Sequence, residues 1–390
     1  MHRILLKKVV VMMALSVMAA GNASAVVTAK LGQPMPDAHP MAIAMNKFVE
    51  LAAKYTNNNV KIQPFHNAVL GSDEKMLQSV QAGTLEFYIG TLAPLSTRIK
   101  EVQVWDLPFM FANTKEVYAL LDGASSKKIF QKLEGTGLHG LMWTGMGFRN
   151  LSNSKRAVTK LDDISGLKIR VMANPVALET WKTLGANAVP MAFAEVFTAL
   201  EIKAIDGQEN PNTLIYDAGF YEAQKYLTIT KHFYTPFVLM IGQKSWDKLS
   251  PNDQKLVQKI ALDTREYERK VNRENNAKYL DLMKKKGIAI NEVSPQDLEK
   301  FKASAKEIYE KFAGDIGKDR PDVYLLAASR LGIEPTDCTV FEDLLVGMRS
   351  AKSVGMRVWA MHDDSSDADW PVICGLADGV MFDFHDAPAV

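Results

Sequence analysis

Two arginines stand beside stretches that have the pattern of β-strands. Arg149 follows the stretch 138–144, and Arg170 lies within the stretch 167–171. An arginine stays charged at ambient pH, and its planar fork can donate to both oxygens of a carboxylate. Their chemistry therefore suits capture of a small organic acid, although an isolated arginine at a strand end is usually a solvated surface group.

Residues 26–316 contain no pattern that indicates catalysis. We find no His–Cys metal spacing, no Gly-x-Ser-x-Gly nucleophile elbow and no phosphate-binding loop in this part of the sequence. A binding protein is favoured over an enzyme, and we expect no cofactor, no catalytic residue and no metal.

The elements that must position these arginines alternate between strand and helix. Strands are predicted over 26–31, 60–65 and 86–91, and helices over 41–55 and 73–82. Ser72 is an N-cap residue for the second of these helices, whose first-turn acids suit the helix dipole. The alternation predicts an α/β fold with largely parallel sheets.

One predicted helix is unusually long. Ser250-Pro251 is a strong helix start, and apolar spacing continues from there to Gly287. Such a helix would be roughly 50 Å long, more than one domain needs, so it would brace two lobes. The alternative is two helices with a break near 272–276.

The first 25 residues predict export. A basic start precedes an apolar run over 9–20, and Ala23 and Ala25 have the spacing that a signal peptidase recognises. We expect cleavage after Ala25 and a periplasmic location. An uncleaved membrane anchor is the alternative, but the run is short for a bilayer span.

Charge divides the chain into two parts. Residues 317–390 hold 6 Lys and Arg against 13 Asp and Glu, whereas residues 1–316 hold 40 against 32. Both cysteines, Cys338 and Cys374, lie in the acidic part. The step suggests two pieces of different origin joined near Gly317. The overall charge of +1 argues against nucleic acid as a partner.

Six motifs in order give residues 26–316 a family likeness. They are Leu-Gly-Ser-Asp at 70–73, Asp-Leu-Pro-Phe-Met-Phe at 106–111, Gly-Phe-Arg-Asn-Leu-Ser-Asn at 147–153, Gly-Leu-Lys-Ile-Arg-Val at 166–171, the stretch 190–200, and Asp-Gly-Gln-Glu-Asn-Pro at 206–211. With these motifs the segment resembles the DctP-type solute receptors of tripartite ATP-independent periplasmic (TRAP) transporters.

The resemblance implies a two-lobed periplasmic binding protein of the class with a long lobe-spanning helix. The expected ranges are 26–146 with 235–270 for lobe I, and 147–234 with 271–316 for lobe II. It implies a monomer that delivers a small carboxylate, namely a C4-dicarboxylate, a keto acid or a sugar acid, to a membrane permease.

The resemblance also assigns site residues. Arg170 matches the family's carboxylate-gripping arginine, Arg149 a second arginine facing the same group, and Asn210 a loop amide that can donate to it. Phe193 is an expected apolar wall. Further candidates, each also open to a capping, surface or packing role, are Glu74, His39, Trp143 and Glu209, whereas Lys168 is expected to be solvated.

The acidic C-terminal part resembles the final portion of a haloacid dehalogenase-type phosphatase or phosphomutase. The stretches 320–324, 340–343 and 351–356 carry this likeness, which implies a partial Rossmann-like fragment with Glu342 and Asp343 as vestigial Mg²⁺ ligands and, with uncertain register, a phosphate contact at Lys318. The family's nucleophile motif, Asp-x-Asp-Gly, is absent from the chain. A Mg²⁺-dependent phosphatase is thus the rejected alternative function.

Overall fold

The computed structural model describes residues 27–316, 324, 328, 333–343, 345–362 and 370–382. The predicted signal peptide and Lys318 lie outside these residues. Within them, no helix combines the length and apolar character that a membrane crossing requires.

An N-terminal lobe is built from the first elements of the chain. They are β1 (Val27–Gly32), α2 (Pro40–Tyr55), β2 (Val60–Phe65), α3 (Asp73–Ala82), β3 (Phe87–Gly90), η1 (Ala93–Leu95), η2 (Lys100–Asp106), α4 (Thr114–Asp122) and α5 (Ala124–Glu134). Ser72 caps α3, as predicted, by accepting a hydrogen bond from the Lys75 amide at 3.3 Å.

The second lobe and the elements shared between the lobes follow. They are β4 (Leu138–Asn153), η3 (Leu161–Ile164), β5 (Lys168–Val171), α6 (Pro175–Thr183), β6 (Asn187–Pro190), η4 (Phe193–Glu195), α7 (Val196–Glu201), β7 (Gly207–Pro211), α8 (Asn212–Asp217), α9 (Phe220–Ala223), β8 (Tyr226–Gly242), α10 (Gln243–Trp246), α11 (Pro251–Lys285), β9 (Ala289–Glu292) and α12 (Pro295–Ile316).

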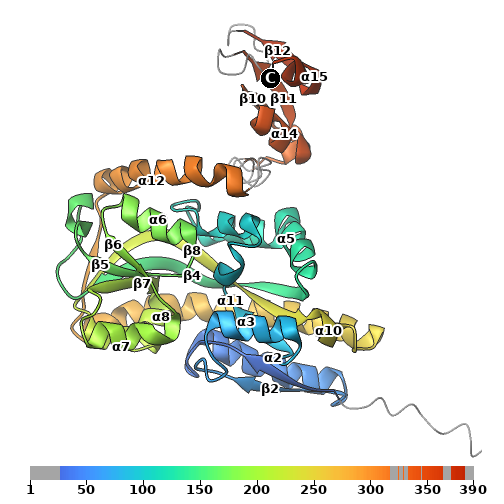
Figure 1. Cartoon of the computed structure of the whole chain (residues 1–390), viewed down its shortest axis with the longest axis vertical. Helices are drawn as coiled ribbons and strands as arrows, with labels where there is room; N and C mark the ends of the chain where they lie inside the picture. The colour runs from blue at the N-terminus through green and yellow to red at the C-terminus, as the bar shows by residue number, and fades with distance from the viewer. Residues whose placement is uncertain are drawn as a thin grey trace, which may run out of the picture.

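Two long antiparallel strands join the lobes. The strand order is β2-β1-β3-β8-β4-β7-β5-β6, and β9 also pairs with β8. The end of β8 pairs with β3, its start pairs with β9, and the last residues of β4 pair with β7. Each strand therefore belongs to both lobes, and Figure 1 shows them crossing the middle of the molecule. β4 continues to Asn153, well beyond the end at 144 that the sequence predicted.

The pairing of these two strands is irregular at three places, and the middle one lies between the lobes. The register shifts between Gly145, opposite Pro236, and Phe148, opposite Tyr234. Gly147 adopts φ +100°, a backbone conformation that favours glycine. A bulge bends a strand and interrupts its ladder, so we expect the lobes to rotate about this point, which we call the hinge.

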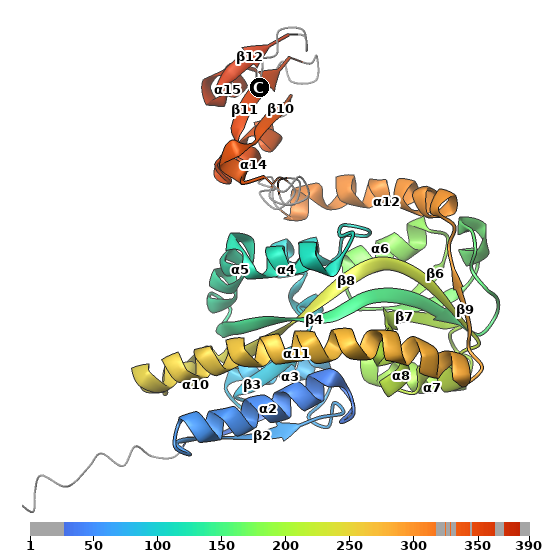
Figure 2. The same ribbon diagram turned by 180° about the vertical axis from the view of Figure 1, so that it is seen from behind.

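The long helix α11 is continuous over 35 residues, as predicted, and the alternative of two helices with a break near 272–276 is excluded. It contacts α2 of the N-terminal lobe, α8 of the second lobe and the shared strand β4. Figure 2 shows it spanning both lobes.

Each lobe is a layered α/β structure. Apolar clusters lie on both faces of its sheet: in the N-terminal lobe beneath α3–α5 and beneath α2 with α11, in the second lobe beneath α6 with α12 and beneath α7–α9. The α/β fold class and the two lobes predicted from the sequence are confirmed.

The C-terminal elements form a second sheet, with parallel order β10-β11-β12. They are η5 (Pro335–Asp337), β10 (Thr339–Glu342), α14 (Leu345–Ser353), β11 (Arg357–Met361), α15 (Trp370–Leu376) and β12 (Gly379–Met381). Among the described residues, no group of three or more acids, histidines or cysteines is arranged to hold a metal ion. The resemblance of this part to phosphatases stays a prediction.

Candidate functional site

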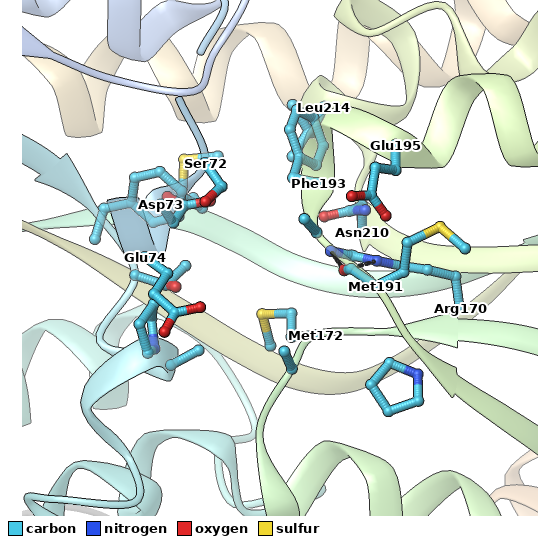
Figure 3. A pocket seen from close by; sticks show the side chains of 18 of the residues that line it. Ser72, Asp73, Glu74, Arg170, Met172, Met191, Phe193, Glu195, Asn210 and Leu214 are labelled. Atoms are coloured by element: carbon cyan, nitrogen blue, oxygen red, sulfur yellow. Dashed lines mark hydrogen bonds between the residues drawn. The ribbon is translucent and has the colours of Figure 1, made fainter. Parts of the chain in front are cut away.

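A cavity of about 460 Å³ lies between the two lobes. One wall comes from the N-terminal lobe, with Met35, Ser72, Asp73, Glu74, Thr91, Ala93, Pro94 and Thr97; the other comes from the second lobe, with Arg170, Met172, Ala173, Pro190, Met191, Ala192, Phe193, Glu195, Asn210 and Leu214. The shared strands supply Met146, Arg149 and Phe237. Figure 3 shows Asp73 and Glu74 across the space from Arg170 and Asn210. We call this space the ligand cavity.

Arg170 lies on β5 and lines the ligand cavity. Its Nε and Nη2 both donate to the carbonyl oxygen of Met191, at 3.0 and 2.7 Å. Among the described residues this carbonyl is the one hydrogen-bond partner of the Arg170 side chain, so its outer guanidinium edge is available to a ligand. Burial, with the nearby charge of Arg149, lowers the pKa of Arg170 to about 10. The side chain still carries its charge at neutral pH, in a site where desolvation strengthens its attraction for an anion.

Arg149, on β4, lines the same cavity but is already paired. Its Nη2 donates to Glu209 Oε1 at 2.8 Å and its Nε donates to Glu209 Oε2. His232 Nε2 lies 3.0 Å from the same Oε2. Burial alone would raise the pKa of Glu209, but Arg149 and His232 lower it to about 2. The charge of Arg149 is largely neutralised, which leaves Arg170 as the stronger anion anchor.

Asp106 lies close to this ion pair. Burial raises its pKa to about 7, although Arg149 works in the opposite direction. Asp106 is therefore only partly ionised near neutral pH, which reduces the negative charge that it adds beside Glu209.

Asn210 follows Glu209 on β7 and is also buried at the cavity wall. Its Nδ2 donates to Gln208 Oε1 at 2.5 Å. An amide nitrogen carries two hydrogens, so one remains for a ligand. The bond to Gln208 holds the side chain in place for that contact.

The opposite wall is acidic. Asp73 and Glu74 form the first turn of α3 and both line the cavity. Asp73 accepts a hydrogen bond from the hydroxyl of Tyr88, and burial raises its pKa despite that bond and the charge of Arg170. Glu74 accepts from Gln78 at 3.2 Å. This wall can accept hydrogen bonds from hydroxyl groups and, where its carboxyls are ionised, would repel a second carboxylate.

Apolar side chains fill the remainder of the lining. Phe193 lines the cavity as predicted and packs against Phe220 with ring centroids 5.7 Å apart. Leu214 and Phe237 continue this surface. Such a wall can pack on the carbon chain of a ligand.

The structure brings together five predicted residues, namely Arg170, Arg149, Asn210, Phe193 and Glu74. Trp143 is a correction: it lies in the core beneath α5, stacked on Phe130 at 5.2 Å, and does not line the ligand cavity. His39, another candidate, does not line the ligand cavity either. It is the N-cap residue of α2, and its Nδ1 accepts a hydrogen bond from the Met41 amide. Lys168 is exposed, as expected.

Sequence reasoning missed Asp73 and Glu195. Asp73 was taken only as a first-turn acid that suits the helix dipole, although it stands in one of the six family-like motifs. Glu195 ends η4, lines the cavity and helps to keep Arg170 protonated. No spacing in the sequence distinguishes Glu195 from a surface acid.

Comparison with known proteins gives concordant results. The model of the family described as "Bacterial extracellular solute-binding protein, family 7" matches residues 31–315. The 2,3-diketo-L-gulonate-binding periplasmic protein YiaO of Escherichia coli K12 is 32% identical over 275 residues, which are 70% of this chain and 83% of that protein.

Two crystal structures extend the comparison. The sugar acid binding protein DctPAm of Advenella mimigardefordensis, in complex with galactonate, matches with a TM-score of 0.76 and 39% identity over 79% of this chain and 99% of that one. A TRAP periplasmic solute binding protein of Polaromonas sp. JS666, bound to D-erythronate, matches with a TM-score of 0.74 and 33% identity over 77% and 98%. The family match ends before the C-terminal part, and the phosphatase alternative receives no support from these comparisons.

Proposed function

Because this chain belongs to family 7 of the bacterial extracellular solute-binding proteins, we propose that it captures a small organic carboxylate for a TRAP-type membrane permease. The observation that carries the proposal is the buried guanidinium of Arg170 at the wall of a cavity between two lobes. The ligand carboxylate binds the outer edge of Arg170, and Asn210 donates a further hydrogen bond. An anion removed from water requires this pairing.

Among the predicted ligand classes, the cavity favours a polyhydroxy acid over a C4-dicarboxylate. Asp73 and Glu74 face Arg170 across the cavity, where they would repel a second carboxylate and accept hydrogen bonds from hydroxyl groups. Two related proteins hold galactonate and D-erythronate, which are both hydroxy acids. A sugar acid is therefore the ligand class that we assign.

Lobe closure accompanies capture in this proposal. The register shift at Gly145–Phe148 coincides with the predicted lobe boundaries at 146/147 and 234/235. Rotation there would open the ligand cavity for entry and then return its two walls to the facing arrangement of this structure, which shields the ligand from water.

Delivery follows export of the chain. We propose that residues 1–25 are removed after Ala25 in the periplasm and that the loaded monomer docks on permease subunits. The chain itself is proposed to perform no catalysis, because its C-terminal part lacks the Asp-x-Asp-Gly nucleophile.

Thermal unfolding of the purified chain with a carboxylate panel tests the proposal. Galactonate at 100 times its dissociation constant is expected to stabilise the protein by about 2.7 kcal/mol, and succinate less at equal concentration. Arg170→Ala should abolish the effect, whereas Lys168→Ala, which removes an exposed cation from the same strand, should keep it. An unchanged response in Arg170→Ala would remove the assigned anchor.

A further inference from the structure

A second cavity, of about 420 Å³, lies at the hinge. The N-terminal lobe supplies Ala112, Asn113, Thr114 and Tyr118, and the second lobe supplies Asn212 and Glu292. The shared strands supply Gly145, Gly147, Phe148, Asn150, Ile229, Lys231 and Tyr234, and α11 supplies Asn272, Arg273, Asn276 and Leu280. We call it the rear cavity.

The two cavities lie on opposite faces of β4. Arg149 lines the ligand cavity, while its neighbours Phe148 and Asn150 line the rear cavity. Successive side chains of a strand project to opposite faces of a sheet. In Figure 2, α4 lies above the shared strands and α11 below them. A molecule in the rear cavity would thus contact both lobes from behind the hinge.

The charged groups that line the rear cavity are two cations and one acid. Lys231 and Arg273 are cations without an ion-pair partner among the described residues, and Glu292 is the one acid in the lining. Asn212 is 3% exposed, and its Oδ1 accepts from Asn150 Nδ2 at 2.9 Å. No described group accepts from Asn212 Nδ2, so this buried donor remains for a bound molecule.

The backbone at Lys231 is held in an uncommon conformation. Its φ is +46°, in the left-handed region that costs energy for a residue with a side chain. Asn150 Oδ1 maintains it by accepting from the amides of Thr230 and Lys231, at 3.1 and 3.0 Å. Asn150 therefore fixes both Asn212 and the segment that presents the lysine.

We propose that the rear cavity binds a small oxyanion, a carboxylate or a phosphate, and that this binding strengthens ligand capture in the ligand cavity. Two cations and a buried amide donor suit an acceptor-rich anion. An occupant that contacts both lobes stabilises the arrangement in which the ligand cavity has walls from both lobes. By linkage, each occupant then raises the affinity for the other. Only this coupling rests on the proposed function.

Calorimetric titration of the Arg170→Ala chain isolates the rear cavity. Inorganic phosphate and acetate serve as separate probes at constant ionic strength, and the tighter of the two identifies the source of the oxyanion. The double variant Lys231→Gln/Arg273→Gln should bind the probe roughly tenfold more weakly or worse, because it loses two charge-assisted contacts. Glu292→Gln should strengthen binding, and Lys270→Gln, an exposed change on α11 outside the lining, should leave it unaltered.

A second titration, on the chain with Arg170 intact, measures the coupling. Saturating probe should increase galactonate affinity several-fold, and the Lys231→Gln/Arg273→Gln variant should lose this increase. If the probe does not bind, or binds the double variant with the same affinity, the proposed site is wrong. If saturating probe leaves galactonate affinity unchanged or reduces it, the proposed coupling is wrong. If galactonate fails to bind at all, the proposed function fails while the probe titration still decides the rear cavity.

Discussion

At the scale of single residues, the two arginines of the ligand cavity are not equivalent anion-binding groups. Arg149 is tied to Glu209, whereas Arg170 is held by a backbone carbonyl that leaves its charge uncompensated by a direct ion pair. The opposite wall, where Asp73 stands at the start of α3, then determines which acidic ligands bind.

Asp73→Asn is expected to change selectivity rather than abolish binding. Galactonate affinity should fall about tenfold or more through loss of a charged acceptor, while succinate affinity should rise because a like charge is removed. Calorimetry with both acids gives the ratio. Asp253→Asn is the control, since Asp253 is likewise an acid in the first turn of a helix with a serine N-cap, Ser250 of α11, and lies outside the cavity. A parallel loss for both acids would contradict the assigned role.

Individual residues show how much of the site could be predicted from the sequence alone. The cap at Ser72 and the cavity position of Arg170 were predictable because a local rule or a motif marks them. The pairing of Arg149 with Glu209 depends on β4 and β7 lying side by side, which no local pattern reveals. Trp143 was misplaced because strand alternation does not tell which face is the core, and the register shift between Gly140 and Met142 changes that alternation.

At the scale of elements, α11 holds the hinge in place. Glu268 is buried and accepts from the Gly145 amide at 3.2 Å, while Asn272 donates to the Gly145 carbonyl and to Glu268. Helix and hinge strand are thus joined by polar contacts as well as by packing. Continuity of this helix was predictable from its apolar spacing and strong start; its contact with the hinge was not.

Glu268→Gln tests this contact through pH. Burial raises the pKa of Glu268 to about 7, so the folded state binds a proton that the unfolded chain releases near pH 4.5. Its contribution to stability is full below that lower value and is lost as pH rises to about 7. The stability of the unaltered chain relative to Glu268→Gln should therefore decrease between pH 4.5 and 7.5, as urea unfolding would measure. A pH-independent difference would mean that Glu268 ionises normally.

At the scale of the whole molecule, the receptor part and the C-terminal part are distinct. The family match covers residues 31–315, and the three-stranded parallel sheet begins only at Thr339. Its own apolar cluster includes Met348, Val358 and Ile373. The change from a basic to an acidic composition near residue 317 indicated this division in the sequence, because two parts with separate surfaces need not share a composition.

A chain ending at residue 316 is expected to bind galactonate with unchanged affinity. None of the residues lining the ligand cavity lies beyond Phe237. Calorimetry on both lengths measures this. A loss of affinity without a loss of folded structure would assign the C-terminal part a share in ligand capture.

The full chain is expected to show no hydrolysis of p-nitrophenyl phosphate with Mg²⁺, because the nucleophile motif is missing. Steady release of p-nitrophenol that disappears in Asp343→Asn would restore the enzyme alternative. Asp337→Asn, an acid in the preceding η5, is the control for nonspecific effects.

The double crossing of β4 and β8, together with α11, has a consequence for how this receptor can diversify. A lobe exchanged between relatives would have to be severed at three separate points of the chain, each inside a hydrogen-bonded element. Recombination of halves is therefore a poor route to a new transport substrate. New specificities are more readily reached by single substitutions on the facing walls, which leave the common frame intact.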